Sequence, residues 1–413
     1  MVVPASSVLA VLSPVLPVSA TSSVSPLESV QPEASRQVRS ATAEKLCICL
    51  IAPSYRVAEK VALASRAPTC HTKRMQTKQT GPRVAVIGAG VAGLSCARTL
   101  CAAGWQVTLF EASAGPGGRC STAVADGHSF DHGAQYFTVR DPELAELVAA
   151  WGRRGAVAPW QPRLWAIDGL AGHRRGAGPV EAGPERLVTV PGMASLGELL
   201  MGEVDRHNLR FLPRTTIAAV RREKFDWELF TAEGHTYIGF RFVVLALPAA
   251  DAAPLLADHG KALQTRANSC SFDPCWTVML TPAQPLQLEF DAAFVNGGPL
   301  SWIADNGSKP GRPPTSGWVL QAEGAWSRAH FEREPAEVAD ELIACFAALI
   351  DRPVVPRFVH THRWSSAKPT PLPEPFLFDR LGIGACGDWC GGPRIEGAFV
   401  SGRALAQAVL ARG

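Results

Sequence analysis

Three glycines and one glutamate in a short stretch of this chain have the spacing of a phosphate-binding turn. Gly88, Gly90 and Gly93 form a Gly-x-Gly-x-x-Gly string, and Glu111 follows it closely. The first glycine permits a tight turn, the second lets the backbone approach a pyrophosphate, and the third lets a helix pack closely on a strand. A carboxylate at the position of Glu111 accepts hydrogen bonds from ribose hydroxyls. These residues therefore indicate the binding of a dinucleotide.

A strand, a turn, a helix and a second strand are needed to position these residues. Residues 83–87 are a short apolar run, which predicts a buried parallel strand. Residues 94–103 have helical composition and stop at Gly104, and residues 106–110 predict a second strand. A phosphate would then lie at the N-terminus of the helix, where free N–H groups and the dipole favour an anion. In this context the glycine string is a strong signal rather than a chance turn.

A second glycine pair distinguishes FAD from NAD. Gly117-Gly118-Arg119 follows soon after Glu111 and resembles the same segment of the glycine-doublet flavoproteins, a group that contains amine oxidases and phytoene desaturases. The resemblance implies that the paired glycines pass close to the dinucleotide and that Arg119 supplies charge near it. The expected cofactor is FAD, bound non-covalently.

The C-terminal region agrees with this resemblance. Residues 381–388 read as an apolar strand ending in Gly387-Asp388, and a helix is predicted from Glu396 through Leu410. The resemblance implies contact of Gly387 and Asp388 with the pyrophosphate and ribityl chain, and a helix N-terminus at the pyrimidine end of the flavin. Strands are also predicted at 226–230 and 241–246. The expected cofactor-binding residues are Gly88, Ala89, Gly90, Val91, Ala92, Gly93, Glu111, Ala112, Gly118, Arg119, Gly133, Ala134, Gln135, Thr215, Gly387, Asp388, Glu396, Gly397 and Ala398.

A narrower resemblance rests on the string Asp-x-Gly-Ala-Gln-Tyr-x-Thr at residues 131–138. With the segments 190–195, 302–311, 362–364, 385–390 and 394–399, it is similar to the renalase family, and especially to its bacterial branch, over residues 83–411. The resemblance implies oxidation of misreduced dihydro isomers of nicotinamide nucleotides. Hydride would pass to flavin N5, and O2 would take the electrons and give hydrogen peroxide.

The expected fold class is α/β, with a Rossmann-type FAD-binding domain of three layers (ββα) and a second α+β domain on a mixed or antiparallel sheet. We assign residues 83–150, 187–252 and 370–413 to the FAD-binding domain. Residues 151–186 and 253–369 would form the substrate domain.

Substrate contacts are predicted from the same strings. The residues expected nearest the substrate ring are Gln135, Tyr136, Asn306 and Trp364. In hydride transfer these side chains would position the substrate and would not transfer a proton. Lys309 is read as a solvated loop lysine rather than a phosphate ligand, and His132 and His362 as hydrogen-bonded structural histidines. Most of the eight tryptophans of the expected substrate domain, residues 151–186 and 253–369, are expected in the core.

The composition of the chain bears on its partners, on metal binding and on its cellular location. Hydrophobic residues make up 47% of the 413 residues and the net charge is only +3, so a large core is expected and a nucleic-acid partner is not. The eleven cysteines match no zinc-ligand spacing, so no metal is expected, and no stretch has the length of a membrane span. Residues 1–82 are Ser-rich and hold nine basic residues, four Glu and no Asp, as in a plastid transit peptide. A start at Met75, with a cytoplasmic protein, is the alternative.

Two other functions remain open. One is a flavin amine oxidase or a desaturase-like enzyme acting on another small substrate. The other is a flavin-binding redox-sensing protein without turnover. The sequence does not distinguish the physiological substrate, the electron acceptor or the oligomeric state.

Overall fold

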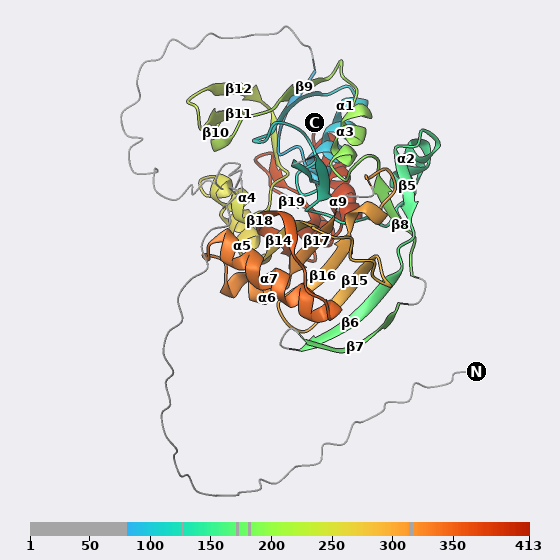
Figure 1. Cartoon of the computed structure of the whole chain (residues 1–413). Helices are drawn as coiled ribbons and strands as arrows, with labels where there is room; N and C mark the ends of the chain where they lie inside the picture. The colour runs from blue at the N-terminus through green and yellow to red at the C-terminus, as the bar shows by residue number, and fades with distance from the viewer. Residues whose placement is uncertain (1–80, 126, 171–172, 181–182, 314–316) are drawn as a thin grey trace, which may run out of the picture. The chain divides into compact units, whose positions relative to one another are not determined.

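The structure is a computed structural model that describes residues 81–413, apart from 126, 171–172, 181–182 and 314–316 (Figure 1). All of the described residues belong to one compact unit. The predicted leader up to residue 80 and Met75 lie outside the described residues.

A six-stranded sheet carries the glycine turn. Its order is β19-β20-β13-β1-β2-β9, and every neighbouring pair is parallel except the edge pair β19–β20. Its strands are β1 (Arg83–Ile87), β2 (Gln106–Phe110), β9 (Leu209–Leu212), β13 (Phe242–Leu245), β19 (Leu377–Phe378) and β20 (Ile383–Ala385).

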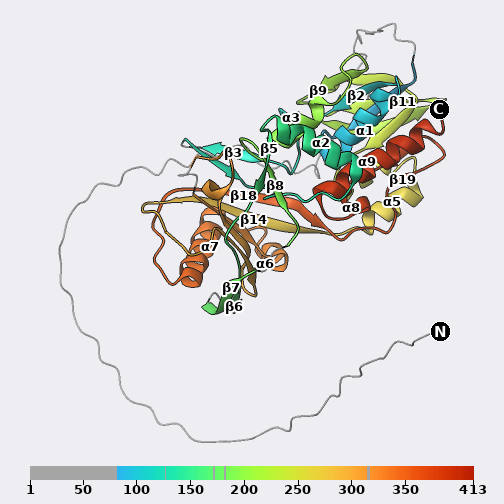
Figure 2. The same ribbon diagram turned by 90° about the vertical axis from the view of Figure 1, so that its right-hand side faces the viewer.

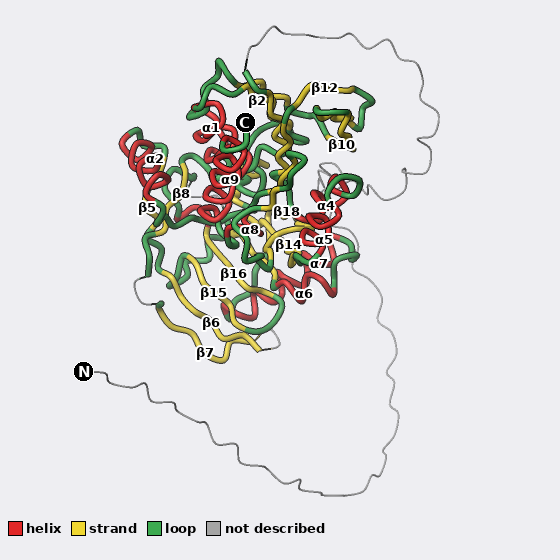
Figure 3. Tube along the Cα trace, turned by 180° about the vertical axis from the view of Figure 1, so that it is seen from behind, coloured by secondary structure: helices red, strands yellow, loops and turns green. Residues whose placement is uncertain are grey.

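Alternating side chains of this sheet build two different interfaces. Val84 and Val86 pack on the helical side, with α1 (Val91–Ala102), α3 (Ser195–Gly202) and α9 (Ile395–Leu410). Ala85 and Ile87 pack on the other side, against a three-stranded antiparallel sheet of β10 (Ile217–Glu223), β11 (Asp226–Thr231) and β12 (Thr236–Phe240). Figure 3 shows α1 and α9 side by side. The predicted three layers are confirmed.

A seven-stranded mixed sheet forms the second part, in the order β18-β14-β17-β16-β15-β6-β7. Only the pair β6–β15 is parallel. Its strands are β6 (Leu164–Leu170), β7 (His173–Pro179), β14 (Phe272–Pro282), β15 (Ala292–Asn296), β16 (Leu300–Asp305), β17 (Trp318–Ala322) and β18 (Pro356–Pro369). The apolar face of α7 (Pro335–Ile350) covers it through Leu342 and Phe346, next to α6 (Gly324–Ala329) (Figure 2).

The remaining elements belong to none of these three sheets. They are β3 (Thr122–Ala125), β4 (His128–Asp131), β5 (Val157–Trp160), β8 (Arg186–Thr189), α2 (Pro142–Arg153), α4 (Ala249–Leu256), α5 (Lys261–Asn268), α8 (Asp388–Gly391) and the 3-10 turn η2 (Asn306–Ser308). No helix in the described residues is long and apolar enough to cross a bilayer.

The α/β fold class is confirmed, and two details differ from the sequence prediction. The first helix begins at Val91 rather than residue 94, because Gly90 provides its N-cap. The strand predicted at residues 226–230 is present as β11, in the covering sheet. The short helix α8 was not predicted, because four residues give no measurable periodicity.

Candidate functional site

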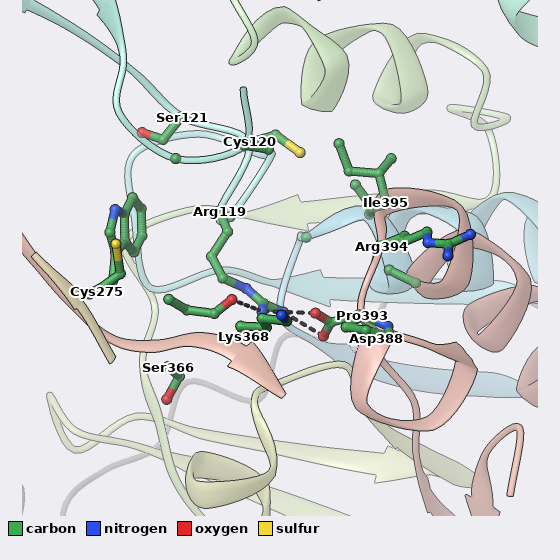
Figure 4. A pocket seen from close by; sticks show the side chains of 18 of the residues that line it. Arg119, Cys120, Ser121, Cys275, Ser366, Lys368, Asp388, Pro393, Arg394 and Ile395 are labelled. Atoms are coloured by element: carbon green, nitrogen blue, oxygen red, sulfur yellow. Dashed lines mark hydrogen bonds and ion pairs between the residues drawn. The ribbon is translucent and has the colours of Figure 1, made fainter. Parts of the chain in front are cut away.

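A cavity of about 1140 Å³ lies between the six-stranded sheet and the seven-stranded sheet. Its wall includes the glycine turn, the loop 117–121, residues 132–140, the end of β18 and the start of α9. In Figure 4, Cys275 and Ser366 come from the seven-stranded sheet, and Arg394 and Ile395 come from the start of α9 on the other side. Segments far apart in the sequence therefore meet around one space.

The glycine turn has the geometry of a phosphate cradle. Gly88 has φ +99°, and a Cβ there would lie 2.5 Å from the Ala246 carbonyl oxygen. A Cβ on Gly93 would lie 1.9 Å from the Gly88 oxygen, so the helix can approach the strand only with glycine there. Gly90 differs, because no atom lies within 4 Å of the Cβ that it lacks. Open space thus lies at the N-terminus of α1, where the first N–H groups have no partner within the helix.

Glu111 is held beside this space by two backbone donors. The Ala89 N–H donates to Glu111 Oε2 at 2.7 Å, and the Ser113 N–H donates to Oε1 at 2.8 Å. A carboxylate can accept about four hydrogen bonds, so acceptor capacity remains for a ribose. Thr215 lies nearby, because its N–H donates to the Glu111 carbonyl at 2.8 Å.

Arg119 and Asp388 form a bidentate ion pair on the cavity wall (Figure 4). Their two hydrogen bonds measure 2.6 and 2.9 Å, and Arg119 also donates to the Ala367 carbonyl at 3.0 Å. The sequence indicated both residues but not their pairing. The pair joins the glycine-doublet loop to the end of β18 and to the start of α8.

The structure brings most of the predicted cofactor residues to the cavity wall. They are Gly88, Gly90, Val91, Ala92, Glu111, Gly118, Arg119, Gly133, Ala134, Gly387, Asp388 and Ala398. The predicted residues outside the wall are Ala89, Gly93, Ala112, Gln135, Thr215, Glu396 and Gly397. Glu396 does not line the cavity, because its carboxylate accepts hydrogen bonds from the backbone N–H groups of Arg140 and, at 2.6 Å, of Asp141.

Two of the four predicted substrate residues, Tyr136 and Trp364, line the cavity. Trp364 lies on β18, where it pairs with Cys275 of β14, and its Nε1–H donates to the His132 carbonyl at 3.1 Å. The other seven tryptophans considered do not line this cavity, and five of them are buried. The expectation that most tryptophans are core residues is confirmed.

Gln135 and Asn306 are instead used in a buried polar network. The Asn306 amide donates to the Ser129 carbonyl at 2.7 Å and accepts the Asp131 N–H at 3.3 Å. Gln135 Oε1 accepts from Lys309 Nζ at 3.1 Å and from Trp302 Nε1 at 3.3 Å. Neither side chain therefore reaches the cavity.

The prediction that Lys309 is a solvated loop lysine is wrong. The residue is neither solvated nor on the cavity wall. Its side chain is fully buried and lies 3.2 Å from Asp131 Oδ2, which also accepts from Arg312 at 2.6 Å. Burial lowers the pKa of Lys309 to about 8, against the opposing effect of Asp131. Burial alone would raise the pKa of Asp131, but Lys309 and Arg312 together hold it below its ordinary value.

His132 and His362 line the cavity beside Trp364. The ring of Trp364 lies 5.3 Å from His132 and 4.3 Å from His362. Burial lowers the pKa of both histidines to about 4, so both are neutral near pH 7. The Nδ1 atom of His132 is buried and has no hydrogen-bond partner in the described residues.

Replacing His132 by phenylalanine should flatten the acid side of the stability profile. The pKa of His132 falls from 6.5 to about 4 on folding, so only the unfolded chain gains a proton as the pH falls through this range. Stability is therefore present above pH 6.5 and lost toward pH 4. Thermal unfolding between pH 7 and pH 5 should show a smaller fall in Tm for His132→Phe than for the original chain. An unchanged fall, matching that of exposed His207→Phe, would contradict the assignment.

Cys120 and Cys275 line the cavity, whereas Cys386 and Cys390 do not. Burial raises the pKa of Cys120 to about 12 and that of Cys275 to about 11. Neither thiol is an activated nucleophile, because the thiolate is the reactive form. The geometry therefore favours non-covalent binding of a cofactor.

Three arginines on the wall were missed by the sequence analysis, namely Arg140, Arg186 and Arg394. One signal could have found the first. Arg140 lies two residues after Thr138, and the cavity-lining segment that contains the Gly-Ala-Gln-Tyr string continues to it. Arg186 and Arg394 come from other segments, and their sequence context gives no such signal.

Comparisons with known proteins agree with this geometry. Residues 86–151 match the family described as NAD(P)-binding Rossmann-like domain. Protoporphyrinogen oxidase 2, chloroplastic/mitochondrial, of Arabidopsis thaliana is 41% identical over 75 residues, which cover 18% of this chain and 15% of that protein. The zeta-carotene-forming phytoene desaturase of Myxococcus xanthus is 41% identical over 81 residues, covering 19% of this chain and 15% of that protein.

Solved structures are similar over a much longer span. A putative protoporphyrinogen oxidase from Exiguobacterium sp. 255-15 has a TM-score of 0.64 at 15% identity, over 81% of this chain and 100% of that one. Cyclohexylamine oxidase from Brevibacterium oxydans has a TM-score of 0.62 at 13% identity, over 81% of this chain and 99% of that one. A triple mutant of putrescine oxidase has a TM-score of 0.61 at 13% identity, over 81% of this chain and 99% of that one.

These relatives include oxidases and desaturases, and no renalase is among those named here. The sequence matches cover only a small part of the curated relatives, and the structural matches are low in identity, so the similarity concerns the fold and the dinucleotide-binding segment. With its glycine cradle, parallel sheet and mixed second sheet, this chain shares the fold of these solved oxidases.

Proposed function

We propose that this protein is an FAD-dependent oxidoreductase that oxidises a small organic substrate in the cavity beside Trp364. The observation that carries the proposal is the open cradle at Gly90, which shares one cavity with Glu111, Arg119, Asp388 and an aromatic wall. The relatives named above, which are oxidases and desaturases, support the same class of reaction.

The residues present suit FAD. The cradle at Gly90 and the N-terminus of α1 would receive the pyrophosphate, and Glu111 would accept the ribose hydroxyls. Asp388 and Ala398 would lie along the ribityl chain and the flavin. We further propose that residues 83–150, 187–252 and 370–413 form the FAD-binding domain, with the rest of 151–369 as the substrate domain. The strands of the two larger sheets fall on the two sides of this division.

FAD, when bound, would supply a hydride acceptor and a route for electrons to O2, giving hydrogen peroxide. The side chains of the wall have a different task. Trp364 and Tyr136 offer flat apolar surfaces against which a ring can be oriented, and they exclude water from it. His132 and His362 are neutral near pH 7 and could accept or donate a hydrogen bond without adding charge.

Two substrate classes compete. The named relatives favour an amine, a polyene or a porphyrinogen, by analogy with amine oxidases, desaturases and protoporphyrinogen oxidases. A renalase-like reaction on a dihydronicotinamide isomer is the second candidate. It is favoured by the flat wall of Trp364 and Tyr136 together with the arginines Arg140, Arg186 and Arg394, which suit a planar substrate with a phosphate.

Anaerobic reduction of the holoprotein would test the proposal. The 2-, 4- and 6-dihydro isomers of NAD, putrescine and cyclohexylamine would each be added while the visible flavin band is recorded. Rapid bleaching by any of them supports an oxidoreductase, and the identity of the reductant assigns the substrate class. If the protein contains FAD but none of these compounds, nor a wider panel of polyenes and porphyrinogens, reduces it, the redox-sensing alternative replaces the proposal.

Replacing Trp364 by alanine should slow flavin reduction by about 10-fold and leave FAD content unchanged, because one stacking wall is lost while the pyrophosphate cradle is intact. Stopped-flow reduction of the holoprotein measures this. Trp326→Ala is the matched control, because Trp326 stacks on His330 and does not line the cavity. Equal reduction rates in both variants would remove Trp364 from the substrate site.

The cellular location stays a prediction. A plastid location depends on residues 1–82, nearly all of which lie outside the described residues, and a cytoplasmic one depends on Met75. The chloroplastic and mitochondrial location in the name of the Arabidopsis relative describes that protein and lends weak support to an organelle.

A further inference from the structure

We infer that Arg140, Arg186 and Arg394 form an anion-binding subsite of the cavity, which selects a substrate bearing a phosphate or carboxylate and disfavours a cationic amine. These three residues are called the arginine cluster below. The inference rests on the proposed function, since it concerns the substrate of the same site.

The cluster is assembled from three separate segments at one part of the cavity. Phe137 and Leu187 exchange two backbone hydrogen bonds of 2.8 and 2.9 Å, which brings the segment before Arg140 beside β8, the strand that begins at Arg186. The Glu396 carboxylate, two residues beyond Arg394, accepts the backbone N–H groups of Arg140 and Asp141. All three arginines line the same cavity, Arg140 and Arg394 as exposed residues and Arg186 as a half-buried one.

Carboxylates lie near the cluster, because Glu396 accepts the Arg140 N–H and Glu185 lines an adjoining cavity. Within the described part of the chain, no ion pair involves any of these three guanidinium groups, whereas Arg119 is paired with Asp388 and Arg403 is paired with Asp141. The Arg186 guanidinium lies 5.4 Å from the centre of the Tyr136 ring, and its Nε–H is buried without a hydrogen-bond partner. A buried donor left unpaired costs free energy, so this arrangement is suited to an acceptor that arrives with a ligand.

The cofactor has another place for its phosphates. The open space at Gly90 and the N-terminus of α1 would receive the pyrophosphate, which leaves the arginine cluster available to a second anion. Guanidinium groups bind phosphate and carboxylate through two parallel hydrogen bonds, and several cations facing one cavity repel an ammonium group. The wall as a whole holds five acidic and five basic side chains, so the preference is local, and an ammonium group is disfavoured only beside the arginine cluster.

Room for the charged part of such a substrate lies next to the cluster. A second cavity of about 410 Å³ lies between α2 and the β5–β8 pair. Thr138, Arg140 and Pro184 line both cavities. A ring held against Tyr136 could thus extend its anionic group past Arg186 toward Arg140.

Ligands that differ in charge but not in ring size would test the subsite. The FAD-loaded full chain would be titrated with benzoate, benzamide and benzylamine, and separately with nicotinamide mononucleotide and nicotinamide riboside. Perturbation of the visible flavin band, or heat of binding, gives each Kd. We expect the anionic member to bind at least about 10-fold more tightly than the neutral one in at least one series, and benzylamine to bind most weakly. Preference for benzoate indicates a carboxylate substrate, and preference for the mononucleotide alone indicates a phosphate.

Variants assign the preference to these residues. Arg186→Gln and Arg140→Gln should each reduce the ratio of the Kd for the neutral ligand to the Kd for the anionic ligand by about 10-fold, while the FAD content stays the same. Arg206→Gln is the matched control, because Arg206 is exposed and away from the cavity. Equal affinities within both series, no binding of the anions, tighter binding of benzylamine, or loss of FAD from the arginine variants would overturn the inference. Failure of the proposed function would give a different result. In that case the original protein would contain no FAD, or no substrate would reduce its flavin.

Discussion

Replacing Gly90 by valine should remove FAD from the protein and leave the fold intact. Gly90 has φ −70° and ψ 179°, an extended conformation that valine adopts readily, and no atom lies within 4 Å of the Cβ position. The new side chain would instead occupy the space expected for the pyrophosphate. We expect FAD affinity to fall by about 100-fold or more, measured as the flavin-to-protein ratio and as the Kd for added FAD.

Gly202→Val is the matched control for this variant. A Cβ on Gly202 also meets no atom within 4 Å, but this residue lies at the end of α3 and not on the cavity wall. Both variants should show the far-ultraviolet circular dichroism of the original protein. A full complement of flavin in Gly90→Val would remove the cradle from the cofactor site and, with it, the basis of the proposed function.

Replacing Asp131 by asparagine should destabilise the protein by about 3–5 kcal/mol, since a buried ion pair is broken by removing one partner. Asp131 is the carboxylate shared by Lys309 and Arg312, and all three side chains are fully buried. The substitution leaves two buried cations without a counter-charge. Denaturant unfolding of the holoprotein, followed by circular dichroism, would measure the loss.

Lys309→Met provides the sharp contrast within the same network. Removing this cation leaves Asp131 paired one to one with Arg312, so the loss should be clearly smaller than for Asp131→Asn. Exposed Asp258→Asn is the surface control and should change stability by no more than about 0.5 kcal/mol. A larger loss of stability for Lys309→Met than for Asp131→Asn would contradict this account. It would show that the network depends more on the lysine than on the shared carboxylate.

This network also explains why two predicted substrate residues are absent from the cavity wall. Gln135 donates to the Asp131 carbonyl at 2.5 Å and accepts from Lys309, and Asn306 binds the backbone of Ser129 and Asp131. These amides hold β4 and the following residues in place. The backbone at Gly133 and the ring of His132 are consequently presented to the cavity.

The sequence by itself determined the cofactor end of this protein. The turn at Gly88–Gly93, the two strands beside it, Glu111 and the last helix were all predicted, and the strands 83–87 and 106–110 agree with the structure residue by residue. These features are readable because backbone groups of one contiguous segment build them. Glycine spacing, strand composition and helix capping act over a few residues and leave a local pattern.

Only the tertiary structure decided the charge and the surroundings of the substrate end. Lys309 meets a carboxylate 178 positions away, and Arg119 meets one 269 positions away. A lysine in a polar loop and a lysine paired inside the protein have the same local sequence, since burial depends on which distant segments pack around it. The arginine cluster was hidden for the same reason. Its three members come from separate segments, and only the packing of these segments around one cavity brings the three arginines to the same wall.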